Sequence, residues 1–174
     1  MIPATSFFDS KTFLQFGHLA EKCIVSTRSS VVIGNCCVLQ NLDLWIEDNN
    51  NKIVIGDNVY IGGAHLAVTG TDKQISIGKN CMLSDGIVMR TGDSHAIIDV
   101  NTNQKINHEA DICIDDHVWI TQNATILKGT VISKDSVVGT GAIVSGNYGC
   151  NCLIAGVPAK VVKEGISWSN KRFV

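Results

Sequence analysis

Residues 114–144 read IDDHVW-ITQNAT-ILKGTV-ISKDSV-VGTGAI-V, with an aliphatic residue at the first of every six positions. This spacing matches neither the 3.6-residue period of a helix nor the simple alternation of a strand. A period of six indicates a parallel β-helix, in which a short strand and a turn form one side and three sides close one coil. The predicted fold class is therefore all-β, a parallel β-helix of hexapeptide repeats.

Similar hexads begin earlier in the chain at Ile55 and Ile77. We expect the first residue of each hexad to point inward and the fifth, which is small or β-branched, to fill the corner inside. The second residue is often Gly, and we expect it to adopt the dihedral angles of a sharp corner. Three hexads per coil place residues eighteen apart above one another, so Ile114 should stack on Ile132. The spacing leaves the hand of the coil open, since parallel crossovers are usually right-handed.

Composition agrees with one compact domain, because the 174 residues are 45% hydrophobic and include 16 Gly but only 2 Pro. The net charge of −2 disfavours nucleic acid as a partner. Seven Cys without framework or zinc-site spacing indicate reduced thiols, with Cys37 and Cys81 as packing residues. No signal peptide or membrane span is evident, so we expect a cytoplasmic protein without a membrane span.

We divide the chain into three segments. Residues 1–22 are rich in Phe and are expected to cap the first coil, since no basic face accompanies the aromatic residues to favour a membrane surface. Residues 23–163 form the β-helix domain, which a long excursion loop interrupts at 91–111. Residues 164–174 form a C-terminal tail.

The excursion loop begins TGDSHAIID at 91–99 and contains His95. A long loop on a rigid solenoid usually serves a function. Histidine titrates near neutral pH and can act as a base there, and Asp93 or Asp99 could orient its ring. A lone His in a polar loop is more often an ordinary surface residue, so Asp-x-His is a weak signal by itself.

The other histidines have no stronger case by sequence. His65 and His108 stand in no recognisable motif. His117 occupies the outward fourth position of a hexad, where we expect it to be solvated.

Four motifs carry a resemblance to a known family: GDSH at 92–95, KIN at 105–107, DHVWI at 116–120 and AGVPAK at 155–160. Together they resemble the hexapeptide-repeat acetyltransferases, which have a left-handed β-helix. Within that family the chain is most similar to bacterial sialic-acid, capsule and lipopolysaccharide O-acetyltransferases. The resemblance is strongest over residues 75–165 and weak in the first fifty.

The resemblance implies an acetyl-CoA-dependent O-acetyltransferase that modifies a sugar hydroxyl of a bacterial surface polysaccharide, such as capsule, sialic acid or lipopolysaccharide. It implies a homotrimer with acetyl-CoA in the groove between neighbouring β-helices. His95 would act as general base in a direct transfer that needs neither a metal nor an acyl-enzyme.

The resemblance also assigns roles to other residues. Trp119 would be the second catalytic residue and pack beside the thioester, and Asp93 would contact the acceptor. The remaining cofactor contacts would come from the backbone at Thr121 and Gln122, from Thr140 and Ser145 beside the pantetheine arm, and from Lys160 and Lys163 at the phosphates. The family commonly has Gly where this chain has Thr121.

Three alternatives stay open at this level. An N-acetyltransferase of an amino sugar nucleotide would use the same base and groove. A non-catalytic β-helix scaffold would not need the excursion. A zinc γ-type carbonic anhydrase shares the fold but needs a spacing of histidines that the five His of this chain do not show.

Overall fold

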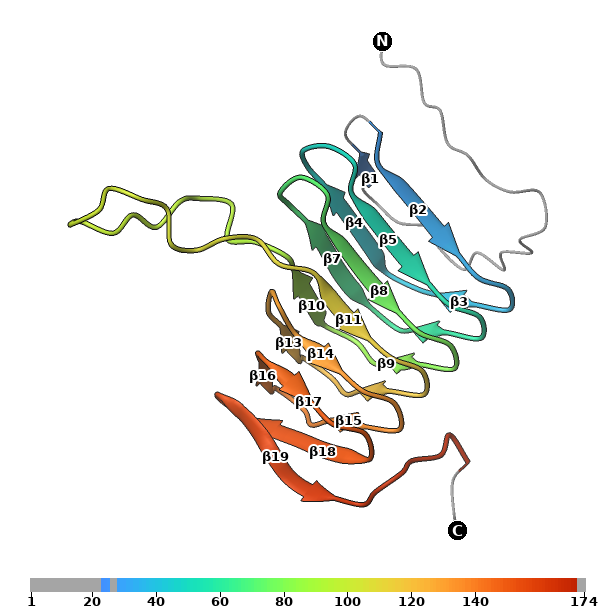
Figure 1. Cartoon of the computed structure of the whole chain (residues 1–174). Coiled ribbons are helices and arrows are strands. Elements are labelled where there is room, and N and C mark those ends of the chain that lie inside the picture. The colour runs from blue at the N-terminus through green and yellow to red at the C-terminus, as the bar shows by residue number, and fades with distance from the viewer. Residues whose placement is uncertain (1–22, 26–27, 172–174) are drawn as a thin grey trace.

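The computed structural model describes residues 23–25 and 28–171. They form three sheets, which the chain visits in a fixed order (Figure 1). Sheet A holds β1 (Cys23–Val25), β4 (Leu42–Ile46), β7 (Ala64–Val68), β10 (Ile87–Arg90), β13 (Thr125–Ile126) and β16 (Ile143–Val144). Sheet B holds β2 (Ser30–Ile33), β5 (Lys52–Ile55), β8 (Gln74–Ile77), β11 (Ile112–Ile114), β14 (Val131–Ile132) and β17 (Asn147–Tyr148). Sheet C holds β3 (Val38–Leu39), β6 (Tyr60–Ile61), β9 (Met82–Leu83), β12 (Trp119–Ile120), β15 (Val137–Val138), β18 (Cys152–Gly156) and β19 (Ala159–Glu164). The predicted cap at 1–22 lies outside the described residues.

The three sheets are the sides of a left-handed β-helix, which confirms the predicted fold class. In Figure 1 the strands of sheet B run from left to right on the near face, the chain returns behind them in sheet A, and each coil lies below the previous one. A coil that turns anticlockwise as it moves away from an observer at its N-terminal end is left-handed. The predicted stacking is also confirmed, because Ile114 pairs with Ile132 and Ile120 with Val138.

The first coils are longer than the predicted eighteen residues. Ile33, Ile55 and Ile77 pair in succession across sheet B, which gives a step of 22 residues. The strands of sheets A and B are longer in these coils than in the last ones, where β13 and β14 have only two residues each. The hexad pattern therefore describes the later coils well and the earlier ones only in part.

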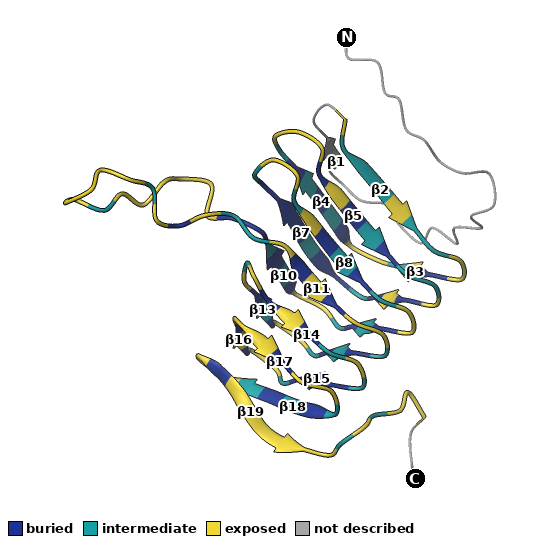
Figure 2. Cartoon of the chain, viewed as in Figure 1, coloured by how far each residue is buried: buried dark blue, intermediate teal, exposed yellow. Residues whose placement is uncertain are grey.

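The core is a column of aliphatic side chains enclosed by the three sheets, dark blue in Figure 2. Fifth-position residues such as Val59, Cys81 and Ala124 are buried within it. Burial raises the pKa of the Cys81 thiol to about 12, so Cys81 packs as a small neutral side chain. Six of the seven cysteines have described side chains, and all six are free thiols.

The expected reason for glycine at the second hexad position is wrong. The left-handed φ angles fall at the fourth position instead, for example 58° at Asn58 and 54° at His117. Glycine is needed because successive coils touch there: a Cβ at Gly56 would lie 2.8 Å from the carbonyl carbon of Gly78, and one at Gly78 would lie 2.5 Å from Oδ1 of Asp116. Close packing of the coils, rather than dihedral freedom, selects the residue.

Two features depart from the regular coils. Residues 91–111 leave between β10 and β11 and project from the corner where sheets A and B meet (Figure 1). At the other end, β19 pairs antiparallel with β18, and the chain then runs back along the β-helix. Within the described part of the chain, no helix is long and apolar enough to cross a membrane.

Candidate active site

Thr91 and Gly92 anchor the excursion loop in the coil. The Thr91 hydroxyl is fully buried, donates to the carbonyl oxygen of Thr69 at 2.9 Å and accepts from the Thr69 N–H at 2.9 Å. A Cβ at Gly92 would lie 2.4 Å from Oγ1 of Thr69. The N–H of Ala110 donates to the Thr91 carbonyl at 2.9 Å and closes the root of the loop. The loop thus starts from a rigid base.

Asn107 organises the segment around His95. Its side chain is buried, and its Nδ2 donates to the His95 carbonyl at 2.8 Å and to Oδ2 of Asp93 at 2.8 Å. Its Oδ1 accepts from the N–H of Ile97 at 2.7 Å. One buried amide therefore holds the backbone on both sides of Ala96 and fixes the path of the chain through His95.

Asp93 is held at the loop root by two partners. The ammonium of Lys128, on the next coil, pairs with Oδ2 of Asp93 and also donates to the Asn107 carbonyl at 3.2 Å. Lys128 and then Asn107 hold the pKa of the Asp93 carboxyl below its ordinary value. One carboxylate oxygen of Asp93 thus braces the loop, and its contact with an acceptor stays a prediction.

His95 itself is exposed on the loop. Its N–H donates to the Asp93 carbonyl at 2.8 Å, and the neighbouring Ser94 hydroxyl accepts from the Arg90 guanidinium at 3.1 Å. No described residue hydrogen-bonds the imidazole ring. Asp99 is turned into its own turn, where Oδ1 accepts from the N–H groups of residues 101 and 102. The backbone of His95 is fixed while its ring is open to a substrate.

Trp119 lies on β12 and is partly buried. Trp168 in the C-terminal tail lies 5.9 Å from it, ring centre to ring centre, and stacks on His117 at 4.4 Å. The indole N–H of Trp168 also donates to the His117 carbonyl at 2.7 Å, and Nδ1 of His117 pairs with Asp135 at 2.8 Å. His117 is therefore solvated only in part: its side chain is 35% exposed, and Trp168, 51 positions later, stacks on its ring.

Several predicted cofactor residues gather at the corner between sheets C and A. The Thr121 hydroxyl donates to the Val138 carbonyl at 2.7 Å and lies 3.2 Å from the hydroxyl of Thr140. Lys160 pairs with Ala155 at the same end of sheet C, further along the corner. The Thr121 N–H is bound to the Val138 carbonyl at 3.0 Å, whereas the Gln122 N–H has no hydrogen-bond partner among the described residues.

Ser145 and Lys163 lie apart from this corner. Ser145 follows β16 at the corner between sheets A and B, where its carbonyl accepts from the Tyr148 hydroxyl at 3.0 Å. Lys163 pairs with Leu153, toward the opposite end of β18 from Lys160. The structure thus places Thr121, Gln122, Thr140 and Lys160 at one corner and separates the other two residues from them.

His95 and Trp119 lie on different sides of one chain. The loop leaves from the corner between sheets A and B, whereas Trp119 belongs to sheet C, the side opposite that corner. Figure 1 shows the loop pointing away from the coils. A single chain therefore presents two separated halves of the predicted site.

A histidine that the sequence did not single out lies in a depression on sheet A. Nδ1 of His65 is 2.7 Å from Oδ2 of Asp43, its direct neighbour across β7 and β4. The 22-residue step of the early coils, if recognised in the sequence, would have revealed this pair. Within the described residues, no cluster of three or more His, Cys, Asp or Glu side chains could hold a metal ion.

The curated relatives of this chain include two polysialic acid O-acetyltransferases. One, from Neisseria meningitidis, is 34% identical over 178 residues, which cover 90% of this chain and 82% of the relative. The other, from Escherichia coli, is 35% identical over 125 residues, which cover 71% of this chain and 40% of the relative. The chain thus spans less than half the length of the second relative. No family model matches the sequence.

Solved structures agree with the fold. The crystal structure of the polysialic acid O-acetyltransferase OatWY superposes with a TM-score of 0.74 at 31% identity, covering 86% of this chain and 87% of that one. A galactoside acetyltransferase in complex with coenzyme A shares the fold with a TM-score of 0.58 at 24% identity, over 78% of this chain and 65% of that one.

Proposed function

The chain belongs to the hexapeptide-repeat acetyltransferases, and from this premise we propose that it transfers an acetyl group from acetyl-CoA to a hydroxyl group of a sialic acid or a related bacterial surface sugar. His95 is the general base of this proposal, and Trp119 lies beside the thioester. The six free thiols described above fit a reducing compartment, and we place the reaction in the cytoplasm.

The observation that carries the proposal is that the backbone of His95 is held in place while its imidazole ring is exposed. Its backbone is held by Asn107 and by the Asp93–Lys128 pair, whereas its ring is open. A general base needs such a fixed position together with an accessible ring nitrogen. A surface histidine without a function would not need a buried amide beneath it.

The proposed reaction is a direct transfer. A ring nitrogen of His95 takes the proton of the sugar hydroxyl as its oxygen forms a bond to the thioester carbonyl carbon. The carbon–sulfur bond then breaks, and the thiolate of CoA takes the proton from the imidazolium. The Gln122 N–H, which has no partner among the described residues, is suited to stabilise the tetrahedral oxyanion.

The corner between sheets C and A supports the position of the acyl donor, which is acetyl-CoA in this family. The hydroxyl groups of Thr121 and Thr140 lie next to each other on successive coils. Lys160 lies further along the same corner. We propose that the pantetheine arm runs along this corner with the phosphates toward Lys160. The Thr121 side chain turns its hydroxyl to Val138, so its bulk is held against the coil.

The activity can be tested by measuring the release of free CoA from acetyl-CoA with oligosialic acid as acceptor. We expect release that depends on the acceptor, and a product that carries an O-acetyl ester. An amino sugar nucleotide is the control. Release with the amine alone would replace the proposal with N-acetylation, and release with neither class of acceptor would overturn it.

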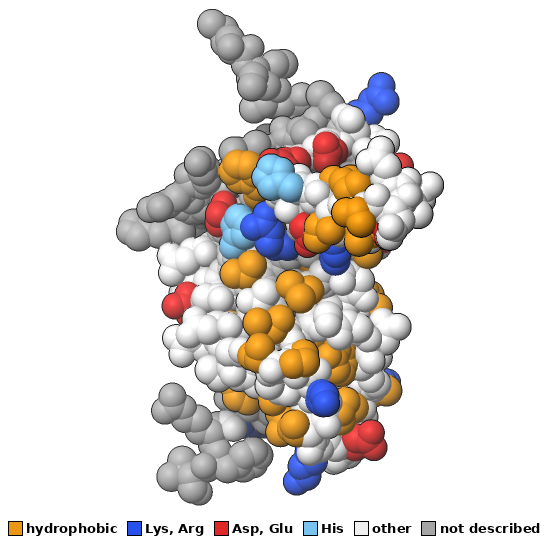
Figure 3. All heavy atoms as spheres, turned by 90° about the vertical axis from the view of Figure 1, so that its left-hand side faces the viewer, with side chains coloured by type: hydrophobic (Ala, Val, Ile, Leu, Met, Phe, Trp, Pro, Cys, Tyr) orange, Lys and Arg blue, Asp and Glu red, His pale blue; other side chains and the backbone are white. Residues whose placement is uncertain are grey.

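We further propose a homotrimer in which each site is shared by two subunits. One chain separates His95 from Trp119, so a second copy must bring the loop and the cofactor corner together. Figure 3 shows hydrophobic side chains on the face below the loop. Exposed aliphatic residues of these coils include Val131 in sheet B, Ile143 in sheet A and Leu127 directly after β13. Closed cyclic symmetry is the usual way to repeat such a contact.

Light scattering of the purified protein should therefore give three times the mass of one chain. Replacing Leu127 with Asp should weaken the trimer and reduce activity in parallel, because a charge would be buried in the contact. The result that contradicts a shared site is a monomer with full activity.

We propose that the phosphates extend along β19 from Lys160 at the corner toward Lys163. Alanine at either lysine should then raise the KM for acetyl-CoA about threefold to thirtyfold and leave kcat nearly unchanged. Both lysines are exposed on β19, so each contact with phosphate should contribute less than a shielded one and weaken at high salt. Contacts remote from the reacting carbonyl act equally in the ground state and the transition state.

Lys134, exposed at the corner between sheets B and C, supplies the matched control, and its alanine variant should keep the wild-type KM. The thioester of dephospho-CoA identifies a lysine that binds the 3′-phosphate, because that variant should no longer distinguish the two cofactors. If both variants keep full discrimination and normal KM values, these lysines do not bind the cofactor.

A further inference from the structure

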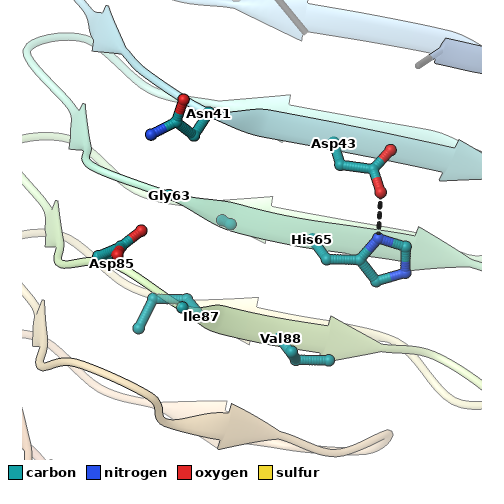
Figure 4. Close-up of a pocket in the computed structure, with 9 residues that line it drawn as sticks. Asn41, Asp43, Gly63, His65, Asp85, Ile87 and Val88 are labelled. Atoms are coloured by element: carbon teal, nitrogen blue, oxygen red, sulfur yellow. Dashed lines mark hydrogen bonds and ion pairs between the residues drawn. The ribbon is translucent and has the colours of Figure 1, made fainter. Parts of the chain in front are cut away.

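A shallow depression of about 260 Å³ lies on sheet A and the adjoining corner with sheet C (Figure 4). Polar side chains around it are those of Asn41, Asp43, His65 and Asp85, and the apolar ones are Ala64, Ile87 and Val88. Its volume is below the 300–1,000 Å³ typical of pockets for drug-sized ligands. It would accommodate one small unit, such as a single sugar ring, rather than a whole nucleotide cofactor.

The His65–Asp43 pair leaves two groups open to a ligand. Oδ2 of Asp43 pairs with Nδ1 of His65, and Oδ1 is enclosed and has no hydrogen-bond partner among the described residues. Nε2 of His65 has no hydrogen-bond partner among the described residues. The side chains of Asp43 and His65 are 44% and 31% exposed, so a ligand hydroxyl group can approach Oδ2 of Asp43 and Nε2 of His65.

Two glycines leave room for the polar side chains at the corner. A Cβ at Gly63 would lie 2.0 Å from Oδ1 of Asp85, and one at Gly86 would lie 2.3 Å from Oδ1 of Asn123. In Figure 4, Asn41 and Asp85 lie on either side of Gly63, at the other end of the depression from the His65–Asp43 pair. Hydrogen-bonding groups therefore stand at both ends, with apolar side chains near them.

We propose that this depression binds the acceptor sugar through hydroxyl groups of its ring, which Asp43 and His65 hold at one end and Asn41 and Asp85 at the other. The inference rests on the proposed function. Two carboxylates favour hydroxyl donors and repel an anion. A sialic acid is thus bound with its hydroxyl-bearing side in the depression and its own carboxylate directed away.

The depression and His95 belong to the same side of one protomer. Val88 is the direct neighbour of His65 across β10 and β7, and Arg90 follows two residues later on the same face. Two residues along a strand span about 7 Å. Arg90 in turn binds Ser94, the residue before His95. One subunit accordingly supplies the acceptor and the base, and its neighbour supplies acetyl-CoA.

Asp43→Asn and His65→Gln should each raise the KM for oligosialic acid about tenfold or more, the effect of losing a hydrogen bond to a charged or buried group. The KM for acetyl-CoA and kcat at saturating acceptor should stay within about twofold. Asp135→Asn is the matched control, because Asp135 also pairs with a half-exposed histidine, at 2.8 Å. It should keep the wild-type KM for the acceptor.

Val88→Phe fills the depression while leaving Asp43 and His65 in the sequence, and it should raise the acceptor KM similarly. It tests the depression without removing either hydrogen-bonding group. Saturation-transfer NMR with oligosialic acid and no acetyl-CoA reports binding without activity, and Asp43→Asn should lose this signal. The inference is overturned if Asp43→Asn and Val88→Phe leave the acceptor KM within twofold of Asp135→Asn. If the wild type binds the sugar through Asp43 but acetylates no acceptor, the depression is a sugar-binding site and the proposed acetyltransferase function is wrong.

Discussion

Replacing His95 with alanine should lower kcat for acetyl transfer at least about 100-fold, the usual contribution of a general base. Binding of CoA should persist, because the imidazole moves a proton and does not hold the nucleotide. The fold should be unchanged, since His95 is exposed and its ring is bound to no described residue. Steady-state rates and calorimetric titration with CoA measure the two effects.

His108→Ala is the matched control, because His108 is an exposed histidine of the same loop. This variant should keep the wild-type rate. A His95→Ala enzyme that retains more than about a tenth of wild-type kcat would place the base elsewhere.

Replacing Asn107 with alanine should lower kcat about tenfold to a hundredfold, because Asn107 positions His95 through the backbone. The substitution leaves the Ile97 N–H and the His95 carbonyl without their partner. A catalytic group that is displaced by about 1 Å can lose about 10² in rate. The KM for acetyl-CoA should change little, since the cofactor corner lies on sheet C, away from the loop root.

Asn101→Ala controls for this experiment, as Asn101 is an exposed asparagine of the same loop, and it should behave like the wild type. Limited proteolysis should cut the loop faster in Asn107→Ala than in Asn101→Ala. A variant that is cleaved faster yet keeps its kcat would show that Asn107 stabilises the loop without positioning the base.

The roles assigned to individual residues depend on the sequence to different degrees. His95 was identified by its place in a polar interruption of the hexads and by a resemblance, and its role stays a prediction. The amide of Asn107 lies in the motif at 105–107, but no pattern indicated that it binds the His95 carbonyl. Trp168 gave no signal at all, because its partners His117 and Trp119 are about fifty residues away.

The His65–Asp43 pair shows why such contacts were missed. The later coils repeat every eighteen residues, and that step does not relate positions 43 and 65. The early coils repeat every 22 residues because their strands are longer. The pairing follows only once the register of those coils is known.

By itself, the sequence determined the β-helix, its inward residues and the position of the loop. Each of these depends on contacts between neighbouring coils that recur along the chain. The same type of residue therefore recurs at the same hexad position, and the pattern can be recognised in the sequence. The tertiary structure alone decided the brace under His95, the stack of Trp168 on His117, and the separation of His95 from Trp119. Each of those contacts occurs once, between segments that no period relates, and its energy depends on where the folded coils place the two partners.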